Sequence, residues 1–367
     1  MRILIAAGGS GGHIFPAVAL ARKLKEKEGS VDILFVGSDK AIDKSIFIKE
    51  GFRYALLSSN KLSYKKSIKT VIFFLRLILD SIRSFFIVAS YRPDSVAGFG
   101  GYVSAPISLA AYILRVPVIA HEQNVVPGRA NKILFNIART IALSFKETGS
   151  RLGKNAAKVV FTGNPIRATL VRSDRAESLK KHGFGADKFT MLVMGGSQGA
   201  HVLNEKFVHA VSMMEESARK NIQVIHITGI KDYSWAVREY EKMGIDHRVY
   251  SFTDNIEDAY SASDLVVTRS GASAIFEVAL FGKPMILVPY PFAMSHQAEN
   301  ARVFTKNGAA IEIDEKDLQP EVFRDRIVSL INNRSALDAL ASGARKMGMP
   351  QASDDLAQAV LRVSKGT

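Results

Sequence analysis

The chain alternates short apolar segments with longer helical patterns, and this alternation limits the folds open to it more than any other feature. In the first half the apolar segments are RILIAA (2–7), VDILFVG (31–37), SVAGFG (95–100), VPVIAHE (116–122), TIALSF (140–145) and VVFTG (159–163). Strands that alternate with helices form a parallel sheet with right-handed crossovers. The first half therefore predicts an α/β domain.

The stretch TGNPIR (162–167) interrupts the pattern, because glycine and proline break regular structure. The pattern then restarts with FTMLVMGG (189–196), QVIHITG (223–229), VYSFT (249–253), LVVTRSG (265–271), PMILVPY (284–290) and AAIEI (309–313). We expect an α/β protein of two Rossmann-like domains, residues 1–163 and 164–340, that face each other across a cleft. The closing segment 341–367 is predicted to be helical and to pack back toward the first domain.

Charge and cysteine content restrict the partners and the chemistry. The 367 residues include no cysteine, which excludes disulfides and thiolate catalysis and favours a reducing compartment. The first strand begins directly after Met1, so we expect no cleavable signal peptide. The net charge of +14 favours an anionic partner. The segment 61–92 holds one acid, Asp80, and seven basic residues: Lys61, Lys65, Lys66, Lys69, Arg76, Arg83 and Arg92.

The segment 65–91 is apolar on two sides when it is drawn as a helix. One row is Ile72, Leu75, Leu79, Ile82 and Phe86, and the other is Phe74, Ile78, Phe85 and Val88. Arg76, Asp80 and Arg83 argue against a bilayer span. Two interpretations stay open: a helix buried on both sides, or a helix whose apolar and basic residues bind an anionic membrane surface.

Three glycine-rich loops each follow a strand and precede a helix: GGSGGH (8–13), GFGGY (98–102) and GGSQGA (195–200). Parallel sheets bind ligands at this edge, and helix N-termini attract phosphates. The loops therefore predict more than one phosphate group. A dinucleotide fingerprint fits poorly, because Ile14 stands where its third glycine belongs, and neither GGSGGH nor GGSQGA is followed by the lysine of a P-loop.

The second half also contains residues suited to sugar hydroxyls. Glu277 lies two turns into the helix predicted after Gly271, where a carboxylate could accept two hydroxyl hydrogen bonds, although an ordinary exposed helix acid is the simpler interpretation. The stretch SHQAENA (295–301) gathers His296, Gln297, Glu299 and Asn300, whose amides carry paired donors and acceptors.

Seven motifs in the same order resemble one family: GGSGGHIFPAVALA, GFGGYVSAP, HEQN, GNPIR, GGSQGA, RSGASAIFE and HQAENA. The chain resembles the MurG family of N-acetylglucosaminyltransferases, which convert lipid I to lipid II in bacterial peptidoglycan synthesis. The resemblance covers residues 1 to about 350. It implies the GT-B fold, with the sugar donor held mainly by the C-terminal domain and the acceptor by the N-terminal one. Ser10 stands where threonine is common in the family, and His296 where glutamine is frequent.

The resemblance also implies roles for single residues. Gly196, Ser197 and Gln198 would bind the diphosphate of UDP-N-acetylglucosamine (UDP-GlcNAc), and Arg167 would pair with phosphate charge. Phe252 and Thr253 would frame the uracil, and Glu277 would accept the ribose hydroxyls. The sugar would meet Ala272, Gln297, Asn300 and Asn124. Ser10, Gly11 and Gly12, which we count among the substrate-binding residues, and Gly100, Gly101 and Tyr102 would face the acceptor pyrophosphate.

The implied reaction is an inverting transfer to the 4-hydroxyl of the muramyl sugar, which needs a base and stabilisation of the departing UDP. His13 is the first candidate base; its alternative role is hydrogen-bond donor to the lipid pyrophosphate. Glu122 is a second candidate base, or a residue that orients His121. We expect neither a metal nor another cofactor.

The expected partners are UDP-GlcNAc, lipid I, an anionic membrane surface and proteins of cell-wall synthesis or division, without nucleic acid. The expected location is the cytoplasmic face of the inner membrane, as a peripheral protein. Two rival functions are a UDP-sugar 2-epimerase of the same fold and a non-catalytic binding module for nucleotide sugars or anionic lipids.

Overall fold

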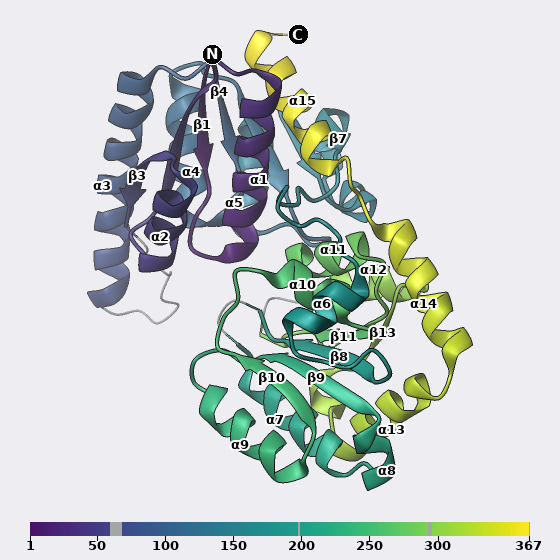
Figure 1. The fold of residues 1–367 in the computed structure, drawn as a ribbon. Coiled ribbons are helices and arrows are strands. Elements are labelled where there is room, and N and C mark those ends of the chain that lie inside the picture. Colours follow the sequence, from purple (N-terminus) through teal and green to yellow (C-terminus); the bar gives the residue numbers. More distant parts are fainter. Residues whose placement is uncertain (59–67, 197–198, 293–295, 367) are drawn as a thin grey trace. The chain divides into compact units, whose positions relative to one another are not determined.

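The computed structural model describes residues 1–58, 68–196, 199–292 and 296–366. It divides the chain into two compact units, Met1–Ala168 with Pro350–Thr367, and Thr169–Met349. Each unit holds one parallel sheet with helices around it (Figure 1). The predicted α/β class with two Rossmann-like domains is confirmed.

The first unit has a seven-stranded sheet in the order β3-β2-β1-β4-β5-β6-β7. Its strands are β1 (Arg2–Ala6), β2 (Asp32–Ser38), β3 (Arg53–Leu57), β4 (Ser95–Gly98), β5 (Val118–Glu122), β6 (Thr140–Leu143) and β7 (Val159–Phe161). Its helices are α1 (Gly11–Lys27), α2 (Ala41–Glu50), α3 (Ile68–Tyr91), α4 (Gly101–Ile113), α5 (Arg129–Ile137) and α15 (Ala352–Lys365). The order reverses between β1 and β4, which is where such sheets bind ligands.

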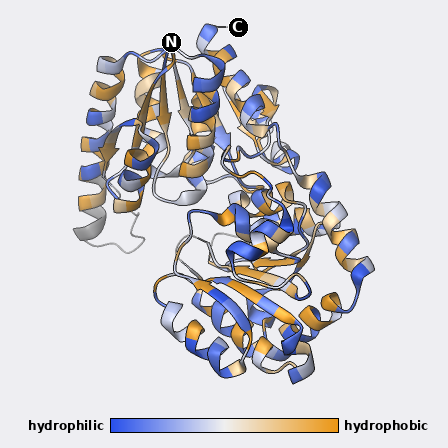
Figure 2. Cartoon of the chain, viewed as in Figure 1, coloured by the Kyte–Doolittle hydropathy of each residue, from blue (hydrophilic) through white to orange (hydrophobic). Residues whose placement is uncertain are grey.

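Side chains of β1 alternate between the two faces of this sheet. Ile3 and Ile5 pack in one core with residues of α1 and α15, while Leu4 and Ala6 pack in the other with residues of α3, α4 and α5. The strands are apolar (Figure 2), as a sheet covered on both faces requires. The last helix, α15, therefore belongs to the core of the first unit.

The second unit has a six-stranded sheet in the order β10-β9-β8-β11-β12-β13. Its strands are β8 (Phe189–Met194), β9 (Ile222–Ile227), β10 (Asp246–Tyr250), β11 (Leu265–Thr268), β12 (Met285–Leu287) and β13 (Ala310–Glu312). Its helices are α6 (Arg175–Lys181), α7 (His201–Ser212), α8 (Glu216–Lys220), α9 (Tyr233–Met243), α10 (Ile256–Ala262), α11 (Ala272–Leu280), α12 (His296–Lys306), α13 (Pro320–Ile331) and α14 (Arg334–Met347). The same reversal occurs between β8 and β11.

The units end later in the chain than the boundaries expected at residues 163 and 340. Ile166 stays with the first unit because its N–H donates to Ser353 Oγ (3.2 Å) and its carbonyl accepts from that hydroxyl (3.0 Å). Helix α14 stays with the second unit because it packs on α11.

Candidate functional site

Two glycine loops of the first unit meet at the carboxyl end of its sheet. One joins β1 to α1 and the other joins β4 to α4, and β1 and β4 are paired neighbours. A Cβ placed on Gly101 would lie 3.1 Å from the Gly8 carbonyl oxygen and 3.6 Å from His13 Cδ2. Gly101 also has φ +75°, so only glycine suits this close approach. The structure thus brings the Ser10–His13 and Gly100–Tyr102 segments together.

Both loops end at a helix N-terminus. Ser10 is the N-cap of α1 and Gly100 the N-cap of α4, and neither makes a side-chain capping hydrogen bond. The first N–H groups of a helix have no partner within the helix, and the dipole makes this end positive. Two such ends beside one another favour an anionic ligand.

Glu122, the second candidate base, anchors a loop in this structure. It is 1% exposed. Its Oε1 accepts from the backbone N–H of Asn124 (2.9 Å), and its Oε2 accepts from the N–H of Gly128 (2.9 Å) and from Asn131 Nδ2 (2.8 Å). Burial raises the pKa of Glu122, while these hydrogen bonds act against that rise. The carboxylate therefore holds the 123–131 loop.

His121 is oriented by Gln123 rather than by Glu122. Gln123 Nε2 lies 3.1 Å from His121 Nδ1, and His121 Nε2 lies 3.2 Å from the Gly163 carbonyl oxygen. A carbonyl only accepts, so Nε2 carries the proton and Nδ1 accepts from the amide. Burial lowers the pKa of His121 to about 4, so the ring is neutral at pH 7.

Tyr102 connects the second glycine loop to α3. Its hydroxyl donates to Asp80 Oδ2 (3.2 Å), and its ring meets the Phe73 ring edge-on. Asp80 is 1% exposed and also accepts from the N–H of Ser58 at 3.3 Å. Tyr102, expected at the acceptor pyrophosphate, therefore fixes the first turn of α4 against the neighbouring helix.

Helix α3 buries one face and exposes most residues of its two apolar rows. Asp80, Ser84 and Val88 face the core, at four-residue spacing. The row expected at a membrane is exposed throughout: Ile72 42%, Leu75 56%, Leu79 59%, Ile82 50% and Phe86 63%. Arg76 and Arg83 are exposed beside it. The interpretation of α3 as a helix buried on both sides is wrong, because the described residues of its two apolar rows are exposed except for Val88. The side chains of Lys69 and Phe74 lie outside the described residues, and so does the segment 59–67 with Lys61, Lys65 and Lys66.

In the second unit the loop before α7 lies against the loop after β9. Gly199 has φ +74°, and a Cβ on it would lie 2.2 Å from the Thr228 carbonyl oxygen. Gly196 has φ +93° and is exposed. Ser197 and Gln198, expected at the donor diphosphate, lie outside the described residues.

A buried hydrogen-bond network holds these two loops, and the sequence reasoning missed it. Asn204 Nδ2 donates to the Thr228 carbonyl (2.8 Å) and to Asp232 Oδ2 (2.7 Å), so its Oδ1 accepts from His226 Nε2 (3.1 Å). His226 Nδ1 then accepts from the Tyr240 hydroxyl (2.9 Å). Burial lowers the pKa of His226 to about 3. In the sequence, this network is indicated only by polar residues, such as Asn204 and His226, that stand within apolar segments.

Glu277 is buried (8% exposed), unlike an ordinary helix acid. It lies on α11, and its Oε2 accepts from the Tyr260 hydroxyl at 3.1 Å. Tyr260 itself is 1% exposed, on α10. A carboxylate held in this way is oriented before any ligand arrives.

Three residues expected at the sugar, Ala272, Gln297 and Asn300, lie around Ser270. Asn300 is fully buried and donates through Nδ2 to the Ser270 carbonyl (3.1 Å), so it braces this turn. Gln297 Oε1 accepts from the N–H of Tyr290 (3.0 Å), and its carbonyl accepts from Ser270 Oγ (2.8 Å). Arg269, which the sequence reasoning missed, pairs with Glu315 and donates to the Val288 carbonyl (3.2 Å). Ala272, the first residue of α11, is 6% exposed.

The remaining expected residues are dispersed. Phe252 is 54% exposed just after β10, and Thr253 Oγ1 accepts from the N–H of Asn255 (3.2 Å). The Arg167 guanidinium lies 4.5 Å above the Phe15 ring, within the first unit. Asn124 is anchored on Glu122 through its backbone N–H.

Within the described residues, no group of three or more His, Cys, Asp or Glu side chains is arranged to hold a metal ion. In the same part of the chain, every helix is too short or too polar to cross a membrane.

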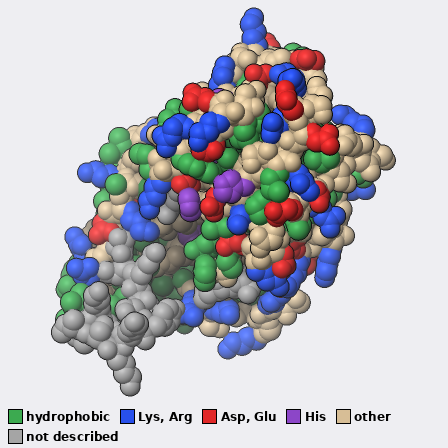
Figure 3. Space-filling model, turned by 90° about the horizontal axis from the view of Figure 1, so that it is seen from below, with side chains coloured by type: hydrophobic (Ala, Val, Ile, Leu, Met, Phe, Trp, Pro, Cys, Tyr) green, Lys and Arg blue, Asp and Glu red, His purple; other side chains and the backbone are tan. Residues whose placement is uncertain are grey.

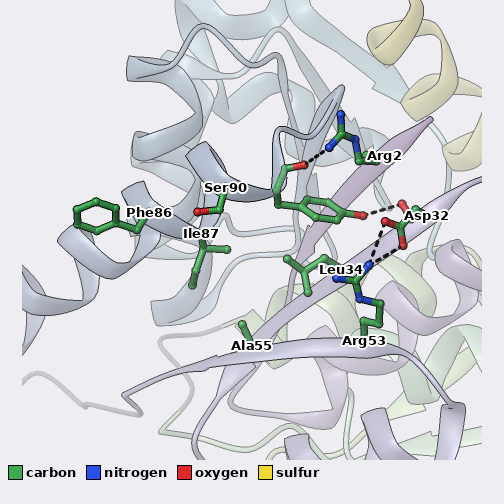
Figure 4. A pocket seen from close by; sticks show the side chains of 9 residues that line it. Arg2, Asp32, Leu34, Arg53, Ala55, Phe86, Ile87 and Ser90 are labelled. Carbon is green, nitrogen blue, oxygen red and sulfur yellow. Dashed lines mark hydrogen bonds and ion pairs between the residues drawn. The ribbon is translucent and has the colours of Figure 1, made fainter.

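A cavity of about 550 Å³ lies at the other end of the first sheet (Figure 4). It is lined by Arg2, Asp32, Leu34, Arg53, Ala55, Phe86, Ile87, Ser90 and Tyr91. Arg2, Asp32 and Arg53 begin their strands, whereas the glycine loops follow strand ends. Its polar groups are paired: Arg53 Nη1 lies 3.3 Å from Asp32 Oδ2, and the Tyr91 hydroxyl donates to the Asp32 carbonyl at 2.8 Å. We assign no substrate to this cavity.

Comparison with known proteins decides the family. Residues 3–143 match the glycosyltransferase family 28 N-terminal domain, and residues 190–356 match its C-terminal domain. The chain belongs to glycosyltransferase family 28. It is 34% identical over the whole of both chains to a family 28 relative from Halothermothrix orenii, the UDP-N-acetylglucosamine–N-acetylmuramyl-(pentapeptide) pyrophosphoryl-undecaprenol N-acetylglucosamine transferase.

Solved structures agree with the family 28 assignment. Acinetobacter baumannii MurG has a TM-score of 0.78 and 26% identity, with 98% of this chain and 99% of that chain covered. The resemblance to MurG is confirmed. A putative UDP-N-acetylglucosamine 2-epimerase from Listeria monocytogenes has a TM-score of 0.72 at 14% identity, with 100% and 97% covered. That likeness shows a shared fold only.

Proposed function

We propose that this glycosyltransferase moves N-acetylglucosamine from UDP-GlcNAc to the muramyl 4-hydroxyl of undecaprenyl-pyrophosphoryl-MurNAc-pentapeptide. One observation carries the proposal: a curated relative of that activity matches the chain from end to end at 34% identity. The epimerase structure from Listeria monocytogenes shares the fold at 14% identity and gives no reason to prefer epimerisation.

The first unit is proposed to bind the acceptor diphosphate at its two adjoining glycine loops. The N-termini of α1 and α4 supply N–H donors and positive dipole ends there. The Arg167 guanidinium, held over the ring of Phe15 on α1, adds a cation in the same unit. These groups can bind the diphosphate of a lipid, which has no nucleobase to be paired or stacked.

The second unit is proposed to bind UDP-GlcNAc. The loop before α7, which lies against the Thr228 carbonyl that Asn204 holds, would take the donor diphosphate at a helix N-terminus. Glu277, oriented by Tyr260, would accept the ribose hydroxyls, and exposed Phe252 would cover the uracil. Gln297 and Ala272 would contact the sugar, with Asn300 holding Ser270 in place.

His13 is the proposed general base. The acceptor oxygen attacks the anomeric carbon while the bond from that carbon to the UDP oxygen breaks, and the hydroxyl proton passes to the base. His13 lies beside Gly101 in the acceptor unit. Since Glu122 is buried under three backbone and side-chain donors, it does not compete for this role. The amides of the α7 loop would stabilise the charge that develops on UDP.

Helix α3 is proposed to rest on an anionic membrane, where an acceptor with an undecaprenyl chain resides. Helix α4, which packs on α3, also exposes the apolar side chains of Leu109, Tyr112 and Ile113. Apolar burial and attraction of Arg76 and Arg83 to anionic headgroups act together. Figure 3 shows Lys and Arg side chains spread among hydrophobic ones on one face of the protein.

A transfer assay tests the proposed function. Purified protein is incubated with UDP-GlcNAc labelled in the sugar and a short-chain lipid I analogue in detergent. We expect label in a lipid product whose new linkage is β, since single displacement inverts the α-linked donor. An unlabelled lipid fraction, with both substrates intact, would refute the proposal and leave the binding-module alternative.

A further inference from the structure

We infer that Lys40 and Asp43 of the first unit are positioning residues for the acceptor diphosphate, because they hold the two successive peptide groups on either side of the Gly9 Cα. The inference rests on the proposed acceptor role of the 8–13 loop. Neither residue belongs to a motif that the sequence analysis singled out.

Asp43 holds the loop from behind. Its side chain is 0% exposed, in the first turn of α2. Oδ2 accepts from the N–H of Gly9 (2.8 Å), from the N–H of Ser38 (2.8 Å) and from Ser38 Oγ (2.6 Å). A Cβ on Gly8 would lie 2.6 Å from the same oxygen, so the glycine lets the loop sit directly on the carboxylate.

Lys40 holds the loop at the next peptide. Its Nζ donates to the Gly9 carbonyl oxygen at 2.7 Å. In a planar trans peptide the C=O and the following N–H point in opposite directions. The carbonyl of Gly9 points to Lys40, so the N–H of Ser10 points away from Lys40. The grip therefore sets the direction of the N–H donor at the N-cap of α1.

Lys40 also balances charge. The buried carboxylate of Asp43 lies beside the proposed diphosphate site. Because the protein interior screens charge poorly, this carboxylate alone would repel the ligand. The half-buried ammonium of Lys40, on the neighbouring peptide group, offsets that charge. Both effects act on binding of the acceptor and neither acts on the donor.

The test compares Lys40→Met, Lys40→Arg and a control on the same helix, Lys44→Met, whose side chain is exposed. In steady-state transfer we expect Lys40→Met to raise the acceptor KM by about tenfold, as for a lost charged hydrogen bond, with kcat and donor KM unchanged. Lys40→Arg, which can still donate to the Gly9 carbonyl, should recover most of the affinity. Lys44→Met should match the wild type.

A binding arm separates this inference from the transfer reaction itself. Farnesyl diphosphate is titrated calorimetrically, with UDP at saturation so that the donor site is filled; inorganic pyrophosphate is titrated in parallel. Lys40→Met should weaken the binding of farnesyl diphosphate about tenfold. If Lys40→Met weakens pyrophosphate binding by the same factor, the protein recognises the diphosphate that both ligands share. If pyrophosphate affinity is unchanged while farnesyl diphosphate binds more weakly, the protein recognises the lipid ester of the diphosphate.

Two results would overturn the inference. One is an acceptor KM and a farnesyl diphosphate affinity within twofold of wild type in Lys40→Met. The other is equal damage to donor KM, acceptor KM and melting temperature, which would give Lys40 a general structural role. If wild-type protein binds the diphosphate and transfers nothing, the proposed function fails while the binding arm still decides the role of Lys40.

Discussion

Buried polar side chains anchor several loops of this protein through hydrogen bonds to the backbone. Glu122 holds the 123–131 loop, and Asn204 holds the loop after β9. The sequence marked HEQN as a candidate chemical motif, but it could not show which N–H groups surround the Glu122 carboxylate. Gly128 and Asn131 follow Glu122 by six and nine residues, and only the folded loop turns their N–H groups back toward it.

His13 is the residue whose role in the chemistry is most open to measurement. If it is the base, His13→Ala should lower kcat by about 100-fold or more, as for loss of a general base, while donor KM changes little. The measurement is steady-state transfer with each substrate varied in turn.

The alternative role of His13 gives a different pattern. A donor to the lipid pyrophosphate would, on removal, raise acceptor KM and leave kcat at saturation near wild type. That pattern would contradict the base assignment.

His226 makes the second unit sensitive to acid. Its pKa is about 3 in the folded unit, against an ordinary value near 6.5 in an unfolded chain. The unfolded chain gains a proton that the folded unit excludes, so this stability is complete above pH 6.5 and is lost as pH falls toward 3. The loss attributable to His226 is at most about 1.4 kcal/mol per pH unit.

Trp235 reports this loss, since it is the chain's one tryptophan and packs on the core of the second unit. Urea unfolding followed by its fluorescence should give a flatter dependence on pH between 6 and 4 in His226→Gln than in wild type. Identical slopes in the two proteins would show that His226 titrates equally in both states.

At the scale of elements, apolar runs located eleven of the strands in the described part of the chain, placed β10 too late and missed β3. β3 is an edge strand whose residues are mostly half-buried, so it lacks a continuous apolar run. The other sheet's edge strand, β10, was placed too late, because Asp246, His247 and Arg248 begin it. Edge strands tolerate polar side chains, and hydrophobic patterns locate them poorly.

Helix α3 gives the sharpest prediction at this scale. Replacing Ile72, Leu75 and Leu79 together by serine should reduce binding to vesicles with anionic phospholipid by at least about tenfold, because three exposed apolar side chains no longer enter the lipid. The melting temperature of this triple variant should equal that of the wild type. Co-sedimentation with vesicles is the measurement.

Ile230→Ser is the matched control, since Ile230 is 84% exposed in the second unit. It should bind vesicles as wild type does. Equal vesicle binding by the triple variant and wild type would contradict the proposal that α3 binds the membrane.

At the scale of the whole chain, the repeated strand–glycine loop–helix pattern was enough to predict two parallel-sheet units and three phosphate loops. The pattern could not predict which of these loops lie next to each other at the carboxyl end of a sheet. That depends on sheet order: β1 and β4 are far apart in the sequence but paired in space. Strand neighbours are decided by long-range packing, which a local pattern does not encode.

Acceptor dependence of UDP release tests the central claim most directly. With UDP-GlcNAc alone, the protein should release no UDP above background and form no epimer; on adding a lipid I analogue, UDP should appear in equal amount to the lipid product. Formation of UDP-N-acetylmannosamine without acceptor, or UDP release at the same rate with and without it, would contradict the account.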